Sequence, residues 1–234
     1  MNLIDLAVIA VFVLVALNAL RKGFMHTALS TALMLLSVLL AFIFMPVMAN
    51  AVKADDGLFN TLLYYTEGSE FINDSELARR DITTLSTEEV NTIVTNANVP
   101  HPIGREIREN ILTDAFAADS VVTLGDYFNQ TMVRCFINIA SFVLLFLCFT
   151  IVLGFLLNWF DYSYRLPRFT KYDALFALAA SLLEGMLAAF VVFTVIPVAL
   201  TLLPLDFVRD MIDESLCARL FYNSNFLLSL MPGV

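Results

Sequence analysis

The sequence predicts an all-α integral membrane protein, with four transmembrane helices and a helical insert outside the membrane. Its hydrophobic content is 59%, whereas soluble domains average about 45–50%. The apolar residues gather in four long runs, which are Leu3–Leu20, Phe24–Ala49, Met132–Phe160 and Ala174–Leu203. Each run can cross a hydrocarbon core of about 30 Å as a helix that rises about 1.5 Å per residue. Basic residues occupy the two short links between runs, as expected for a multi-pass membrane protein.

The four runs divide the chain into parts with different surroundings. Residues 1–49 hold the first two transmembrane helices, 50–131 an acidic helical insert, 132–203 the third and fourth transmembrane helices, and 204–234 an amphipathic tail. The lipid bilayer is therefore the first partner that the sequence predicts. The insert is far longer than an ordinary loop, so we expect it to carry secondary structure of its own.

The basic residues predict which links face the cytoplasm. The link Arg21–Gly23 holds two basic residues and no acid, and the link Asp161–Asp173 holds three basic residues. Because cytoplasmic loops carry an excess of Lys and Arg, both links should lie inside, with both termini, the insert and the tail outside the cytoplasm. The insert carries fourteen acidic and five basic residues, and this charge argues against a nucleic-acid partner.

Helices are expected at three places in the insert. Ser86–Glu89 has the spacing of a capping box, which predicts a helix that continues to about Asn96. The segment Pro102–Phe116 starts with a proline and continues with apolar residues at helical spacing, which predicts a second helix. A third helix is expected within Phe71–Arg80. We interpret the insert as a small helical domain that docks on a partner or on the membrane part; the alternative is a partly disordered spacer.

The tail also has helical periodicity. Phe207, Met211, Leu216 and Leu220 recur between charged residues. This pattern predicts an amphipathic helix that lies on the outer membrane surface. Asp5, at the opposite end of the chain, opens the first apolar run and is expected to be a boundary residue.

Residues suited to catalysis or metal binding form no recognisable motif. The three cysteines lack metal-ligand spacing, and the histidines, His26 and His101, are far apart. The chain has no glycine-rich phosphate loop and no nucleophile–base signature. We therefore expect a protein that is not an enzyme, with no cofactor and no metal site.

The fourth run has a face of small residues. Ala177, Ser181, Gly185 and Ala189 recur every four residues and share one side of a helix. Small residues at this spacing let helix backbones approach closely in lipid. The face predicts contact with another helix, either within the chain or through self-association of the chain.

Glu184 is the candidate functional residue inside the membrane. It lies about ten residues from the predicted cytoplasmic end of its run, which is close to the bilayer midplane at about 1.5 Å per residue. A charged side chain there costs about 2.5–3.5 kcal/mol on insertion scales. Two interpretations stay open: a proton- or ion-responsive group that faces a cavity, or a structural hydrogen bond to a hydroxyl such as that of Thr150 or Ser37.

Several of these residues also carry a family resemblance. The chain resembles the bacterial colicin V production protein (CvpA) family, multi-pass proteins of the inner membrane. The resemblance begins with Ile4-Asp5 and continues with the turn Arg21, Lys22, Gly23 and Phe24. It resumes in the fourth span, where the family has an Asp followed at +4, +8 and +12 by glycines and at +11 by an Arg. Here those positions are Asp173, Ala177, Ser181, Gly185 and Glu184, so the packing face is kept and the charge is inverted.

The resemblance implies a bacterial inner-membrane location and a role in colicin V production or export, or in envelope homeostasis. It supplies no catalytic residue. The leading hypothesis is a non-enzymatic accessory factor that docks an envelope protein through residues 50–131. The alternative is a small oligomeric transporter or channel that assembles through the fourth helix and uses Glu184.

Overall fold

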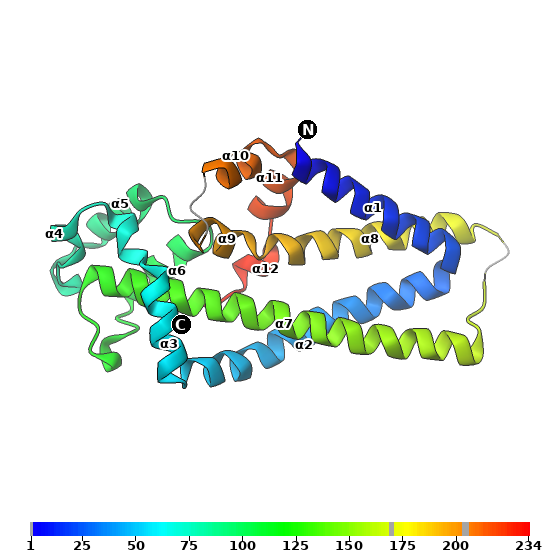
Figure 1. Ribbon diagram of the computed structural model, residues 1–234, viewed down its shortest axis with the longest axis horizontal. Helices are drawn as coiled ribbons and strands as arrows, with labels where there is room; N and C mark the ends of the chain where they lie inside the picture. Colours follow the sequence, from blue (N-terminus) through cyan, green and yellow to red (C-terminus); the bar gives the residue numbers. More distant parts are fainter. Residues whose placement is uncertain (1, 169–170, 203–205) are drawn as a thin grey trace. The chain divides into compact units, whose positions relative to one another are not determined.

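The computed structural model describes residues 2–168, 171–202 and 206–234, and its regular structure is helical (Figure 1). Within those ranges no strand is assigned, although Asp81 and Thr123 form an isolated bridge. Four helical segments are long and apolar enough to cross a membrane, which confirms the predicted fold class. They are α1 (Leu3–Lys22), α2 (Phe24–Lys53), α7 (Leu124–Tyr164), and the segment Asp173–Thr201, which contains α8 (Asp173–Phe193) and most of α9 (Ile196–Leu202).

The shorter helices lie in the insert and the tail. Those of the insert are α3 (Asp56–Thr66), η1 (Gly68–Ile72), α4 (Ser75–Ala78), η2 (Ile82–Thr84), α5 (Thr87–Ala97), α6 (Ile103–Leu112) and η3 (Ala117–Asp119). Those of the tail are α10 (Asp206–Glu214), α11 (Leu216–Asn223) and α12 (Phe226–Ser229). The expected end of the fourth run at Leu203 and the expected start of the tail at Pro204 lie outside the described residues.

The chain packs as two units. The span unit comprises Met1–Met45, Phe142–Thr194 and Asp206–Asn225, and the insert unit comprises Pro46–Ser141, Val195–Leu205 and Phe226–Val234. Helices α2 and α7 each contribute residues to both units. The boundaries expected after residues 49 and 131 therefore fall inside continuous helices.

The span unit is built from helix pairs. Helix α1 packs along α8, and α11 packs on both (Figure 1). Helices α2 and α7 meet through aromatic side chains, with ring centroids 4.6 Å apart for Phe42 and Phe142. The large apolar side chains on the outer faces of these helices are exposed, as expected where the solvent is lipid.

The insert unit has a buried core of its own. Helices α5 and α6 pack together, and the core continues onto the first turns of α7, where Leu124, Tyr127 and Phe128 are fully buried. Exposure changes along α7: Ile139 is 1% exposed, whereas Ile151 is 70% exposed. The first part of the third apolar run is therefore covered by the insert unit, although composition alone assigned it to lipid.

The contacts of Arg134 also indicate that the start of α7 belongs to the insert unit. Its guanidinium lies 2.8 Å from a carboxylate oxygen of Asp119 and stacks over the Phe116 ring, 4.7 Å from the ring centroid. A charge with both an ion-pair and an aromatic partner is a normal feature of a folded water-facing domain. Phe116 lies beyond α6 yet is buried in the same core.

Local sequence signals for the helices of the insert have mixed outcomes. The capping box of Ser86 and Glu89 is present at the start of α5, which ends at the left-handed residue Asn98. Helix α6 starts directly after Pro102, as predicted. The third helix, expected within Phe71–Arg80, is present as the short α4, and the left-handed residue Asn73 separates it from η1.

Breaks in the fourth run and the tail also have identifiable causes. Helix α8 ends at Phe193, four residues before Pro197, where the proline ring would meet the carbonyl group of an unbroken helix. The tail is not one helix, because Ser215 starts a new helix by accepting a hydrogen bond from the Ala218 amide. The last residues, 226–234, pack into the insert unit, and the amides of Asn110 and Asn138 donate to their backbone carbonyls.

Candidate functional site

Glu184 lies beside a small cavity within the span unit. The cavity has a volume of about 60 Å³, which exceeds the space that one water molecule needs. The hydroxyl of Ser30 on α2 donates to Glu184 Oε1 over 2.8 Å. The cavity is lined by Ser30, Leu33, Met34, Ser37, Thr150, Leu153, Gly154, Leu157 and Glu184.

Both interpretations of Glu184 thus find a counterpart in the structure. The carboxylate accepts an interhelical hydrogen bond, but from Ser30 and from neither of the two hydroxyls expected from the sequence. Ser37 donates to the carbonyl of Leu33, and the buried Thr150 hydroxyl has no partner among the described residues. Both of these hydroxyls line the cavity with Glu184. The expected residues are therefore close to Glu184, but the hydrogen bond to its carboxylate comes from Ser30.

The small-residue face of α8 packs against α1. Ala177, Ser181, Gly185 and Ala189 are all buried. A Cβ added at Gly185 would lie 2.9 Å from two ring carbons of Phe12, so the glycine lets the aromatic ring approach the helix backbone. The expected contact with another helix is therefore made within the chain, and self-association through this face stays a prediction.

The turn Arg21–Phe24 is joined to the start of α8 by Asp173. Gly23 has φ +89°, which favours glycine, and the carboxylate of Asp173 accepts from the Phe24 amide at 3.3 and 3.4 Å. Arg168 donates to the carbonyl of Arg21. A carboxylate at the first amide of α2 satisfies a free helix donor and complements the helix dipole. The turn Arg21–Phe24 and Asp173, which both belong to the family resemblance, therefore lie in contact.

Asp5 is a buried site that the sequence analysis missed. It is 2% exposed, and it accepts from the Ser215 hydroxyl at 2.7 Å and from the Cys217 amide at 2.9 Å. It also forms part of a capping box with Asn2. Asp5 lies at the end of the first span, as expected, and it also joins the start of α1 to the start of α11. The sequence signal that could have found it is the Asn2–Asp5 spacing.

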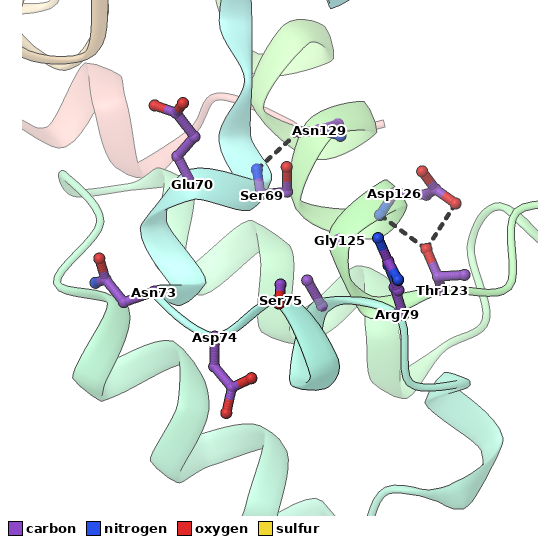
Figure 2. Close-up of a pocket in the computed structure, with 11 residues that line it drawn as sticks. Ser69, Glu70, Asn73, Asp74, Ser75, Arg79, Thr123, Gly125, Asp126 and Asn129 are labelled. Atoms are coloured by element: carbon purple, nitrogen blue, oxygen red, sulfur yellow. Dashed lines mark hydrogen bonds between the residues drawn. The ribbon is translucent and has the colours of Figure 1, made fainter.

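The insert unit carries an open polar groove beside the first turns of α7 (Figure 2). Its volume is about 560 Å³. The lining side chains include the carboxylates of Glu70, Asp74 and Asp126 and the guanidinium of Arg79, an excess of negative charge. The groove is lined by Ser69, Glu70, Asn73, Asp74, Ser75, Ala78, Arg79, Thr123, Gly125, Asp126 and Asn129.

Hydrogen bonds fix part of the polar groove. The Ser69 amide donates to Asn129 over 2.8 Å, and the Thr123 hydroxyl donates to Asp126 over 2.6 Å (Figure 2). The first bond joins η1 to α7, which are distant in sequence, and the second lies at the start of α7. No motif pointed to this groove, because its residues come from two segments more than forty positions apart.

The cysteine, histidine and acidic side chains of the described residues are dispersed. Its residues contain no group of three or more histidine, cysteine or acidic side chains that could hold a metal ion. Cys135, Cys148 and Cys217 are free. Burial and the neighbouring Asp5 raise the pKa of the Cys217 thiol, which lowers its reactivity.

Comparison with known protein families gives a match at the start of the chain. The family model described as "Colicin V production protein" matches residues 4–79. This range covers α1, the turn with Gly23, α2 and the start of the insert, and it ends before the fourth span. No curated protein and no solved structure matches the chain.

Proposed function

We propose that this chain is a member of the colicin V production protein family, whose model matches residues 4–79, and that it is a non-enzymatic accessory factor in toxin production or export, or in envelope homeostasis. It would act by docking another envelope protein on the polar groove of the insert unit. The observation that carries the proposal is this groove, which lies on a domain with its own buried core. A rigid domain that presents an open polar surface is suited to binding.

The chemistry of the groove indicates the kind of partner. Three carboxylates and one guanidinium line it, together with hydroxyl and amide groups. A partner segment rich in Lys or Arg would pair with the carboxylates, and complementary charge increases association rates and specificity. The seryl and threonyl groups of the groove are not paired with a histidine in the lining, which supports a binding role over a hydrolytic one.

We place the chain in the bacterial inner membrane, with both termini and the insert outside the cytoplasm. The support is the basic composition of the two short links and the acidic composition of the insert. Cysteines introduced singly at Thr92 and at Tyr162, in a chain without its native cysteines, test the orientation. An impermeant maleimide added to intact spheroplasts should label Thr92→Cys and not Tyr162→Cys; the opposite pattern would reverse the orientation.

Photo-crosslinking tests the docking role. A photo-reactive amino acid at Ser75, in the groove, should crosslink one envelope protein in native membranes, whereas the same group at the exposed Thr92 on α5 should not. Glu70→Lys should reduce the crosslink, and Glu88→Lys, the same charge reversal outside the groove, should leave it unchanged. Equal crosslinking from Ser75 and Thr92 would contradict docking at this groove.

A second function, transport, is favoured by the polar cavity beside Glu184. A small transporter or channel would need the carboxylate on its route, and Glu184 lines the cavity. Proteoliposome flux tests this alternative. Ion or proton flux that disappears in Glu184→Gln would support transport, and an absence of flux in the unmodified protein would leave the docking role.

A further inference from the structure

From the cavity beside Glu184, we propose that the span unit binds one monovalent metal cation, with sodium as the probe ion. The site would be formed by the Glu184 carboxylate and the hydroxyls of Ser30, Ser37 and Thr150. The inference concerns binding and does not require transport. It therefore goes beyond the docking role and would give the transport alternative its ligand.

Two of the hydroxyl groups in the cavity lining already donate their protons, so their oxygens remain available only as acceptors. The Ser30 hydroxyl donates a hydrogen bond to Glu184 Oε1, and the Ser37 hydroxyl donates one to the carbonyl of Leu33. Their oxygen lone pairs, and the second oxygen of Glu184, remain to bind a ligand. A cluster of oxygen acceptors attracts a cation and repels an anion.

Thr150 supplies an independent indication of a ligand. Its hydroxyl oxygen is buried and has no hydrogen-bond partner within residues 2–168, 171–202 and 206–234. A buried polar group without a partner is costly and uncommon in folded proteins. A cation, or a water molecule bound to it, would satisfy this oxygen.

The charge and the size of the site select the cation. Glu184 is the one acidic side chain in the lining, and the described residues give it no cationic partner. One carboxylate balances one positive charge, so a monovalent ion fits and a divalent ion would leave excess charge in an apolar surrounding. The volume of about 60 Å³ has room for an ion and water at the usual oxygen distances.

Gly154 is a glycine in the cavity lining that no packing contact explains. It lines the cavity from α7, and a Cβ added there would meet nothing within 4 Å. Glycine weakens a helix relative to alanine by about 1 kcal/mol, yet no close packing contact requires it here. A larger side chain at this lining position is therefore a direct way to perturb the cavity.

Thermal unfolding of the purified full chain in nanodiscs tests the proposal. A ligand that binds only the folded state raises Tm with its concentration. We expect Tm to rise as sodium chloride replaces choline chloride at constant ionic strength. Glu184→Gln should abolish this rise, and Thr150→Val should weaken the apparent affinity about tenfold, the effect of losing one polar contact of about 1.4 kcal/mol.

Gly154→Val adds a bulky side chain at a residue that lines the cavity and removes no ligand group. It should fold, keep or raise the Tm in choline, and lose the response to sodium. Ser181→Ala, on the α1-facing side of α8, is the matched control and should keep the response. Equal Tm in sodium and choline for the unmodified protein, or a full sodium response in Gly154→Val, would overturn the proposal. Sodium-dependent Tm without flux would refute transport and leave the site.

Discussion

The carboxylate of Asp173, the first residue of α8, accepts a hydrogen bond from the backbone amide of Phe24, the first residue of α2. The carboxylate thus caps a helix that begins 149 positions earlier in the chain. Gly23 makes this possible, because a Cβ at that position would lie 3.0 Å from Asp173 Oδ2. The shared link between the ends of two spans therefore depends on one glycine and one carboxylate.

Gly23→Ala should destabilise the protein. At φ +89° and ψ 170°, a non-glycine residue carries strain of about 1–3 kcal/mol, and the added methyl group would also press on Asp173. Asp173→Ala should cost about 0.5–2 kcal/mol, as for loss of an N-cap. Thermal unfolding in nanodiscs measures both. Gly154→Ala is the control, since it adds the same methyl group to open space; an equal Tm loss in Gly23→Ala and Gly154→Ala would contradict the explanation.

The contact between Gly185 and Phe12 should behave as a coupled pair. Gly185→Leu would force its side chain into the Phe12 ring, and overpacking of this kind costs about 1–3 kcal/mol. Phe12→Ala in the same chain should restore part of that loss, which gives a coupling energy of about 0.5–3 kcal/mol in a double-mutant cycle. Additive effects in the cycle would indicate that the α8 face is used by another partner, such as a second copy.

Most helices of the span unit could be predicted from the sequence. Fewer of the contacts that form the candidate sites could be predicted. Apolar runs reveal α1 and α2 because their composition is set by lipid, and Ser86 with Glu89 reveals α5 because a capping box is local. The bond between Asp5 and Ser215 could not be predicted, because two short polar residues at opposite ends of the chain carry no spacing signal. The start of α7 was assigned to lipid, because an insert core and a bilayer select the same apolar residues.

Loss of the Asp5 carboxylate should change the reactivity of Cys217. Burial, the hydrogen bond to Asp5 and its negative charge raise the pKa of this thiol. Asp5→Asn removes the charge, so the pKa should fall, the thiolate fraction at a fixed pH should rise, and alkylation should accelerate. Maleimide labelling of a chain with Cys135→Ser and Cys148→Ser measures the rate. Arg209→Gln, a charge change in the neighbouring α10, serves as the control; an unchanged or slower rate in Asp5→Asn would contradict the predicted link.

The capping box of α5 should make the stability of the insert unit depend on pH. Hydrogen bonds from the Ser86 backbone amide and hydroxyl lower the pKa of Glu89 below its ordinary value. A carboxylate with a lowered folded-state pKa stabilises the fold fully above its unfolded-state pKa, and this contribution is lost as the pH falls through the folded-state pKa.

Glu89→Gln isolates this contribution. The difference in Tm between the unmodified protein and Glu89→Gln should be greatest near neutral pH and should shrink as the pH falls below 4.5, the ordinary pKa of a glutamate. Glu88→Gln removes the same charge from the same helical turn and leaves the capping box in place, so its Tm difference should depend less on pH. A Tm difference for Glu89→Gln that stays constant down to the acid limit would show that the ionised cap does not stabilise α5, because the charged form would then contribute nothing that its neutral replacement lacks.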